Sequence, residues 1–267
     1  MQQATSNRPD FLWRNLFRLP YFRGLLRAVE ATYYQDLRLA VPVLDVGCGD
    51  GIFAELTFEQ KIDVGIDPWL QPLREAVASN MYKMLVHGAG NLLPCPDGYF
   101  QTVISNSVLE HIPDLQPVLA EISRVIKPGG QFIFCVPNDN FLKNLGVSNT
   151  LDKLGWRSAA DGYRAFFNKI SRHHHCDNQD TWRARLDAHD FELVSAWDYF
   201  TPMATRTLEF GHYLGLPALV SKVLFGRWIL APTQWNLSLT RKITAPYYES
   251  DQKQPGGSYS FYVARRR

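Results

Sequence analysis

The feature that most constrains this chain is a glycine-rich turn directly after a short apolar run. Residues 43–51 read Val-Leu-Asp-Val-Gly-Cys-Gly-Asp-Gly, so a predicted strand leads into a G-x-G-x-G turn. Glycine is needed in such a turn because the backbone bends tightly and approaches a ligand closely, with no room for a Cβ atom. The sequence therefore predicts a strand, a ligand-binding turn and a helix, which together begin an α/β unit.

A second acidic residue, Asp67, ends the next predicted strand, twenty-two positions after Asp45. A carboxylate at this place in a doubly wound fold can accept hydrogen bonds from both ribose hydroxyls. Taken alone, Asp67 is more simply a cap for the following helix; combined with the glycine turn, it indicates a nucleoside site. A nicotinamide oxidoreductase is disfavoured, because dinucleotide sites use the longer G-x-G-x-x-G spacing and Asp45 would repel a phosphate.

Short β-branched or aromatic runs alternate with longer amphipathic stretches along the chain, which predicts a parallel sheet wrapped by helices. We expect strands near 42–46, 62–67, 82–86, 100–105, 131–136, 191–199 and 259–264. We expect helices at about 51–59, 70–79, 114–126 and 179–189. After Pro137 the signal weakens through a Gly- and Asn-containing stretch. The division expected is an N-terminal helical cap over 1–40 and one α/β domain over 41–267, with an apolar insertion at about 201–256.

Composition excludes several classes of protein. With 46% hydrophobic and 20% charged residues, the 267-residue chain is unlike a disordered protein. The four cysteines form no C-x-x-C pair, so neither a disulfide framework nor a zinc ribbon is predicted. No apolar run is long enough to span a bilayer, and four arginines interrupt the region where a signal peptide would have its apolar core. We expect a cytoplasmic protein, soluble or peripheral to a membrane.

Four ordered motifs carry a resemblance to a known family. They are the D-x-G-C-G-x-G loop from Asp45, the run Leu93-Pro94 with Pro96-Asp97-Gly98-Tyr99-Phe100, the run from Val103 to Ile112 that contains Leu-Glu-His, and Lys127-Pro128-Gly129-Gly130. With these motifs the chain resembles the class I S-adenosylmethionine-dependent methyltransferases of the small-molecule group, over residues 41–200 and again at the last strand. The resemblance implies a Rossmann-like, doubly wound, mostly parallel seven-stranded sheet whose last strand is antiparallel.

The resemblance also implies S-adenosyl-L-methionine as the cofactor. Asp45, Gly47 and Gly49 would surround its methionyl part with Cys48 between them, Asn106 would line the same end, and Asp67 would hold the ribose. Pro68 and Trp69 would flank the adenine. Relatives often place an acid after the third strand to contact the adenine amine, whereas this chain has Ala89 there; Gly90 or Asn91 would then take that contact. Another departure is His189-Asp190 before Phe191, where relatives have glycine; Asp tolerates a left-handed backbone.

Histidines are the candidate catalytic residues. If the acceptor is a hydroxyl, a histidine can take its proton. The candidates are His111 in the Leu-Glu-His segment and His173 or His175 in a triple histidine beside Cys176. For His111 the alternative is a structural support. We predict no metal, since adjacent histidines do not readily converge on one tetrahedral ion.

Both ends of the chain are basic, and both contain apolar residues. Residues 1–30 carry five arginines against two acids, and residues 201–267 carry nine basic residues against three acids. The stretch 11–27 reads as a lid helix over the cofactor, as a helix lying on an anionic membrane surface, or as both. The apolar insertion would roof an apolar or lipid-like acceptor, form a dimer contact or touch a membrane. Arg265–Arg267 reads as a solvated tail, and nucleic acid is disfavoured.

The function predicted from the sequence is methyl transfer to a small, apolar or lipid-like acceptor, with O-, C- and N-methylation all open. The alternative is a non-catalytic partner subunit that keeps the nucleoside pocket, since binding and reaction require different residues. The chain would act as a monomer or a homodimer.

Overall fold

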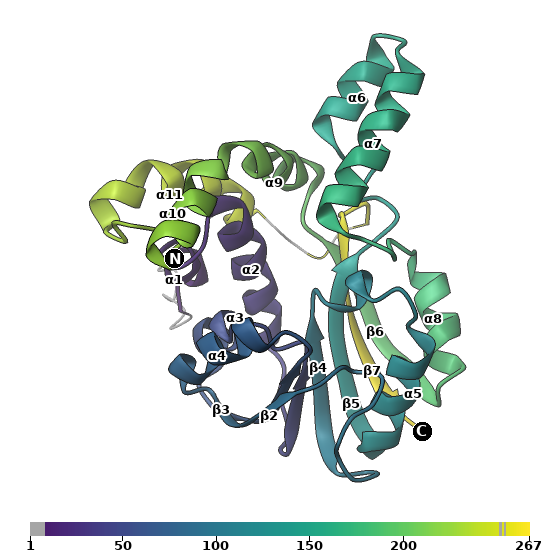
Figure 1. The fold of residues 1–267 in the computed structure, drawn as a ribbon. Coiled ribbons are helices and arrows are strands. Elements are labelled where there is room, and N and C mark those ends of the chain that lie inside the picture. Colours follow the sequence, from purple (N-terminus) through teal and green to yellow (C-terminus); the bar gives the residue numbers. More distant parts are fainter. Residues whose placement is uncertain (1–8, 251–252, 254) are drawn as a thin grey trace, which may run out of the picture.

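The computed structural model describes residues 9–250, 253 and 255–267, and shows a seven-stranded sheet flanked by helices (Figure 1). The strand order is β3-β2-β1-β4-β5-β7-β6. β7 runs antiparallel to β5 and β6, and the other neighbouring strands are parallel. This confirms the predicted fold class. Residues 1–8 of the expected cap, and 251, 252 and 254 of the expected insertion, lie outside the described residues.

The strands lie close to their predicted positions. They are β1 Val43–Val46, β2 Ile62–Asp67, β3 Tyr82–His87, β4 Phe100–Asn106, β5 Ile126–Pro137, β6 Phe191–Tyr199 and β7 Tyr259–Arg266. The predicted helices are α3 Ile52–Thr57, α4 Leu70–Ser79, α5 Gln116–Val125 and α8 Gln179–Asp187. The Lys-Pro-Gly-Gly turn falls inside β5, which therefore begins earlier than expected.

Each face of the sheet packs against its own apolar core. Phe132 and Phe134 of β5 point into one core with α5 and α8, while Ile133 and Cys135 point into the other with α1 Phe11–Leu16 and α2 Tyr21–Tyr34. Successive side chains of a strand point to opposite faces, so β5 reads as a continuous apolar run because both faces are covered.

The stretch after Pro137 contains two helices that the sequence did not predict. They are α6 Gly146–Lys153 and α7 Arg157–Ser171, which form a hairpin standing away from the sheet (Figure 1). α7 buries only Ala160 and Phe167, so its apolar stripe is narrow. Neither helix has a side-chain cap at its N-terminus, which removes the usual sequence sign of a helix start.

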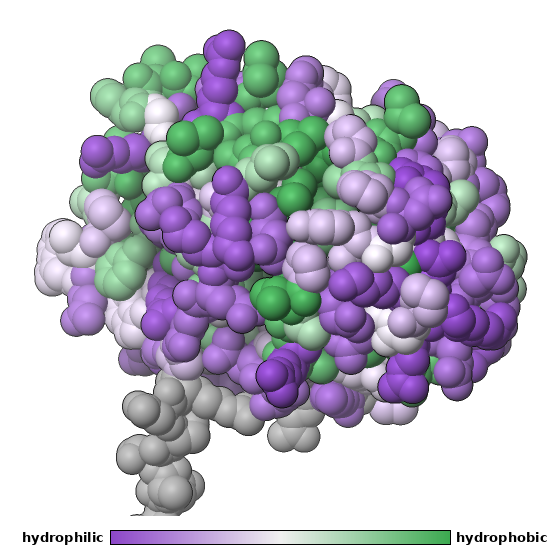
Figure 2. Space-filling view, turned by 90° about the horizontal axis from the view of Figure 1, so that it is seen from below, coloured by the Kyte–Doolittle hydropathy of each residue, from purple (hydrophilic) through white to green (hydrophobic). Residues whose placement is uncertain are grey.

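The insertion consists of three helices, α9 Pro202–Leu214, α10 Leu216–Phe225 and α11 Gln234–Glu249. α9 and α11 pack against α2, α11 also packs against α1, and α10 contacts α9. All three helices lie on the same side of the sheet as α1 and α2 (Figure 1). In the view from below, most of the surface is hydrophilic, and the apolar side chains gather near the top of the picture (Figure 2). Among the described residues, no helix combines the length and apolar character needed to cross a bilayer.

Two expectations about the C-terminal part have clear outcomes. Asp190 adopts a left-handed backbone with φ of 62°, as expected. The solvated-tail interpretation is wrong for two of the three final arginines. The Arg266 guanidinium donates to the carbonyl oxygens of Arg124 and Ile126, and Arg267 pairs with Asp187. β7 continues to Arg266, so these side chains lie beside acceptors at the sheet end.

Candidate functional site

The glycine turn joins β1 to α3 and uses three left-handed glycines. Gly47, Gly49 and Gly51 have φ values of 81°, 56° and 74°. A Cβ atom at Gly47 would lie 2.4 Å from a methyl group of Val108, whereas one at Gly49 would meet nothing within 4 Å. Packing therefore requires glycine at Gly47, while Gly49 faces open space next to a cavity.

Asp67 ties the end of β2 to this turn. Its Oδ2 atom accepts a hydrogen bond from the Gly49 N–H at 2.9 Å, and its Oδ1 atom accepts one from the Trp69 N–H at 2.8 Å. The residue is buried, yet it lines a cavity. Each carboxylate oxygen retains a second lone pair, so both can still accept a hydroxyl.

Asp45 supports the turn from behind. It is buried, lines none of the cavities described below, and accepts a hydrogen bond from the Tyr82 hydroxyl at 2.7 Å. Burial raises the pKa of Asp45 to about 7, although the Tyr82 hydrogen bond acts against the shift. The structure thus separates Asp45 from the cavity-lining glycines Gly47 and Gly49.

A first cavity of about 620 Å³ lies along the carboxyl ends of β1 and β2. Asp67 lines it, and Trp69 beside it is 70% exposed. It brings together six of the predicted cofactor-binding residues, which are Gly47, Asp67, Pro68, Trp69, Gly90 and Asn91. Ala89 also lines this cavity, and so does Asp114, an acidic residue that the sequence interpretation did not consider.

A second cavity of about 420 Å³ lies on the other side of the glycine turn. Gly47, Cys48, Gly49 and Asn106 line it. Its remaining wall includes Arg23 and Arg27 of α2, with Lys222 and Trp228 of the insertion. The N-terminal helix therefore covers the turn, as the lid interpretation of residues 11–27 expects.

A third cavity of about 180 Å³ is enclosed by α2, α9 and the segment after α7. Its polar lining includes Glu110, His111, His173 and His212, and its apolar lining includes Phe22, Phe141 and Leu208. His111 is the residue that lines all three cavities. The ring of His111 is thus reachable both from the cofactor side and from this smaller, partly apolar cavity.

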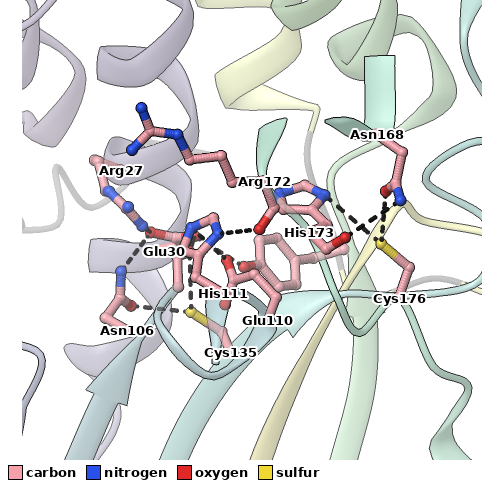
Figure 3. Close-up of polar contacts among 12 residues, drawn as sticks. Arg27, Glu30, Asn106, Glu110, His111, Cys135, Asn168, Arg172, His173 and Cys176 are labelled. Atoms are coloured by element: carbon pink, nitrogen blue, oxygen red, sulfur yellow. Dashed lines mark hydrogen bonds and ion pairs between the residues drawn. The ribbon is translucent and has the colours of Figure 1, made fainter. Parts of the chain in front are cut away.

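Backbone hydrogen bonds bring the triple histidine to His111. The N–H groups of His174 and His175 donate to the carbonyl oxygen of Glu110 at 2.7 and 3.3 Å. The rings of His111 and His173 then lie 5.4 Å apart, centroid to centroid (Figure 3). His175 instead turns toward the Pro113 carbonyl and Asp177, and lines none of the three cavities. Of the two alternatives in the triple histidine, His173 is the one that lies beside His111.

The tautomer of His111 follows from its contact with Arg172. Nδ1 of His111 lies 3.0 Å from the Arg172 carbonyl oxygen, which can only accept, so Nδ1 carries the hydrogen and Nε2 has a free lone pair. Burial lowers the pKa of His111 below its ordinary value, and burial lowers the pKa of His173 to about 3. Both rings are therefore neutral at physiological pH.

Glu110 is buried beside these histidines. Its Oε2 atom has no hydrogen-bond partner, and burial raises the pKa of its carboxyl group to about 8. Ligand atoms of Glu110, His111 and His173 lie within 4.8 Å of one another, the one such grouping of three among the described residues. The prediction that the chain holds no metal stays a prediction at this grouping.

Glu30 of α2 is a site residue that sequence reasoning missed. It is fully buried, and its carboxylate accepts hydrogen bonds from Arg27 at 2.6 Å, Asn106 at 2.7 Å, Ser107 at 2.9 Å and Tyr199 at 3.1 Å (Figure 3). This network fixes the lid helix to the end of β4. The available signal was a single acid, Glu30, among the apolar residues of this helical stretch, three positions after Arg27, which indicates a buried partner.

Fold and site together define a class. The antiparallel β7, the glycine turn after β1 and the carboxylate at the end of β2 are the features that the resemblance to the class I S-adenosylmethionine-dependent methyltransferases implies.

Comparison with known proteins agrees with this class. Residues 44–134 match the family model described as a methyltransferase domain. The chain is 36% identical over 107 residues to a ubiquinone biosynthesis O-methyltransferase of Pectobacterium carotovorum, a match that covers 37% of this chain and 44% of that protein. The corresponding enzyme of Vibrio atlanticus is 34% identical over 119 residues, 42% of this chain and 50% of that protein. The chain thus spans about half the length of the curated relatives it matches.

A solved structure extends the likeness over the whole chain. Geranyl diphosphate C-methyltransferase from Streptomyces coelicolor aligns with a TM-score of 0.55 and 14% identity, covering 100% of this chain and 88% of that one. At this identity the likeness concerns the fold. Residues 44–134 form a methyltransferase domain, which confirms the resemblance to S-adenosylmethionine-dependent methyltransferases seen in the sequence.

Proposed function

We propose that this chain transfers a methyl group from S-adenosyl-L-methionine to the hydroxyl of a small, apolar or lipid-like acceptor. The observation that carries the proposal is the position of His111, whose ring borders the two cavities around the glycine turn and the separate, partly apolar cavity. A group at this junction can meet a donor on one side and an acceptor on the other.

The residues around the glycine turn fit the two halves of the cofactor. Asp67 keeps acceptor capacity for ribose hydroxyls, and the exposed indole of Trp69 offers a flat apolar face for the adenine. On the other side of the turn, the open space at Gly49 and the polar side chain of Asn106 suit the methionyl end. When bound, the cofactor supplies an activated methyl group on its sulfonium.

His111 would act as the general base for a hydroxyl acceptor. Nε2 has a free lone pair because Nδ1 donates to the Arg172 carbonyl oxygen. The lowered pKa keeps the ring neutral, so Nε2 would be able to accept the hydroxyl proton as the methyl group passes from sulfur to oxygen and S-adenosylhomocysteine is left. Proton transfer to a base held in this way typically accelerates a reaction by about 10²- to 10⁴-fold. His173 then supports the ring of His111 from the side away from the glycine turn.

The acceptor class rests on the lining of the small cavity. Phe22, Phe141 and Leu208 give it apolar walls. Its polar lining consists of Arg23, Arg27, Ser107, Ser171, Glu110 and the three histidines, which can orient a polar group of the acceptor. The relatives named O-methyltransferases support oxygen as the acceptor atom over carbon or nitrogen. The proposed location is the cytoplasm, in line with the four free cysteines, together with contact to a membrane surface.

Two measurements test the proposal in sequence. Calorimetry with S-adenosylmethionine, S-adenosylhomocysteine and NAD should show binding of the first two and none of NAD. Turnover is then measured over a panel of phenols with apolar tails, for the unmodified protein, His111→Gln and the matched control His175→Gln. We expect His111→Gln to lower kcat by about 10²-fold or more, and His175→Gln to leave it within a few-fold. Binding without turnover of any phenol would favour the non-catalytic partner subunit.

A further inference from the structure

The short helix α10 turns its apolar side chains toward solvent. Its apolar side chains at spacings of three and four residues form one stripe, made of Leu216, Leu219, Val220, Val223 and Leu224. All five are exposed, at 62%, 47%, 55%, 75% and 67%. A surface helix normally buries such a stripe against the core.

The opposite side of α10 is polar and faces the protein. Ser221 is buried and donates to the Arg227 carbonyl oxygen, and the Lys222 ammonium pairs with Glu75 of α4 at 2.6 Å. Lys222 also lines the cavity beside the glycine turn. Because these contacts fix which side turns inward, the apolar stripe must point outward.

Close packing at the start of α10 fixes its place. Gly211 and Gly215 lie against Phe22 of α2, where an added Cβ atom would approach the Phe22 ring to 2.6 and 2.7 Å. The end of α9 extends the exposed apolar surface with Phe210 and Leu214, which are 51% and 69% exposed. We call this surface, from Phe210 to Leu224, the α10 face.

Charge complementarity indicates what covers the α10 face. From residue 210 to residue 248 the sequence contains no Asp or Glu, whereas it contains Lys222, Arg227, Arg241 and Lys242. Lys222 pairs with Glu75, and Arg241 pairs with Asp10 and Glu249. The cations left for a partner are therefore Arg227 and Lys242, which are exposed. Apolar side chains combined with cations and no acids fit an anionic lipid surface, where the side chains enter the headgroup boundary and the cations meet phosphates.

A second copy of the chain is the other occupant to consider for the α10 face. A stable protein interface needs roughly 800 Å² from each partner, so it would have to extend beyond α10, a ten-residue helix about 15 Å long. Shallow insertion into lipid has no such threshold, since its strength grows with each buried apolar side chain and each cation.

We propose that the α10 face docks on anionic membrane surfaces. This assigns the membrane contact to a different segment from the N-terminal stretch. There the apolar side chains of Phe11, Leu12 and Leu16 are buried, and Arg18 and Arg27 are paired with acids of the protein itself. The inference does not depend on methyl transfer.

Vesicle flotation of the full chain tests this inference. The probes are vesicles of phosphatidylcholine alone and of phosphatidylcholine with phosphatidylglycerol, at low and at high salt. We expect binding to the vesicles with phosphatidylglycerol and much less to pure phosphatidylcholine. High salt should weaken the binding because it screens the attraction between cations and headgroups.

Two double variants locate the contact. Leu219→Asp with Val223→Asp should lower the vesicle-bound fraction about tenfold or more. Val77→Asp with Leu154→Asp adds the same charge at other exposed apolar sites, which are 67% and 59% exposed, and should leave binding unchanged. Circular dichroism and light scattering show whether each variant is folded and monomeric.

Three results would overturn the inference: no flotation of the unmodified chain with phosphatidylglycerol, equal flotation of the Leu219/Val223 variant, or equal loss in both variants. A dimer that the Leu219/Val223 variant dissociates, without any flotation, would assign the face to a second copy instead.

Discussion

The two sides of the candidate site are built in different ways. On the cofactor side, the glycine turn and Asp67 come from two neighbouring strand ends within 25 residues of each other. On the other side, Glu30 and His173 lie far apart in the sequence. Only the fold brings Glu30 to Ser107 and His173 to His111, four residues further along the chain. The first side is a local motif, and the second is a product of tertiary packing.

This difference predicts different responses to substitution. Residues of the local motif that have room beside a cavity, such as Gly49 and Asp67, have backbone partners nearby, so changing one should mainly affect the ligand. Residues of the assembled side are buried polar groups that satisfy each other, so changing one should mainly affect stability. The variants below test that contrast, starting from the largest expected effect.

Glu30→Ala should have the largest effect on stability. It removes the acceptor for Arg27, Asn106, Ser107 and Tyr199 at once and leaves the Arg27 guanidinium without its carboxylate. Breaking a buried ion pair by removing one partner typically destabilises by about 3–5 kcal/mol. Urea unfolding measures this change, and Glu30→Gln, which keeps the shape and an acceptor, should lose less. A loss below that of an ordinary surface substitution would show that the network does not hold the lid helix.

Gly47→Ala and Gly49→Ala form a matched pair within the local motif. Both have positive φ, but a Cβ atom at Gly47 would overlap Val108, whereas one at Gly49 meets open space. We expect Gly47→Ala to lower the free energy of unfolding by about 2–3 kcal/mol, and Gly49→Ala by about 1 kcal/mol from backbone strain alone.

Calorimetry with S-adenosylhomocysteine completes the comparison. The space beside Gly49 is where we propose the methionyl end lies, so Gly49→Ala should reduce affinity although the variant remains folded. If Gly49→Ala binds as the unmodified chain does, that placement is wrong.

The same contrast explains how far the sequence predicts the molecule. Seven strands, the glycine turn and the carboxylate of Asp67 follow from local patterns, since strand ends in a parallel sheet meet at one edge. The helices α6 and α7 were missed because their starts carry no capping residue and their apolar stripes are narrow. The role of Glu30 was missed because no local pattern shows which distant hydroxyls and amides will surround a carboxylate.

The histidines show an intermediate case. Their residue type indicated proton transfer, but the sequence could not choose between His173 and His175. That choice depends on two backbone hydrogen bonds to the Glu110 carbonyl, which turn His173 toward His111 and His175 away from it. Such loop contacts leave no periodic pattern in a sequence.

Asp67→Ala should weaken ligand binding more than folding. It removes the proposed acceptor for the ribose hydroxyls, and hydrogen bonds to a charged group contribute about 1.5–3 kcal/mol, which corresponds to a roughly 10- to 100-fold loss in affinity. Asp67→Asn keeps one oxygen acceptor and should lose less. Calorimetry with S-adenosylhomocysteine measures both. Unchanged affinity in Asp67→Ala would remove the ribose contact from the proposal.

Asp45 makes the stability of the folded chain depend on pH, and this dependence can be measured without any ligand. Its pKa is about 7 in the folded chain because it is buried, whereas an unfolded chain has a carboxyl pKa of about 4. As pH rises from about 4 to about 7, the unfolded state therefore releases the proton first, and the contribution of Asp45 to stability falls. Asparagine does not ionise, so Asp45→Asn should gain stability relative to the unmodified chain by up to about 1.4 kcal/mol per pH unit over this window.

Asp63 provides the matched control for this effect. Its burial opposes ionisation, but hydrogen bonds from Lys83 and the Val43 N–H hold the pKa of Asp63 below its ordinary value. Its contribution is therefore complete above about pH 4 and is lost only below it, so Asp63→Asn should show no drift between about pH 5 and pH 8. Urea unfolding of both variants across that range measures the difference. Parallel curves for the two variants would mean that Asp45 ionises normally, and that the carboxyl group behind the glycine turn is reached by water.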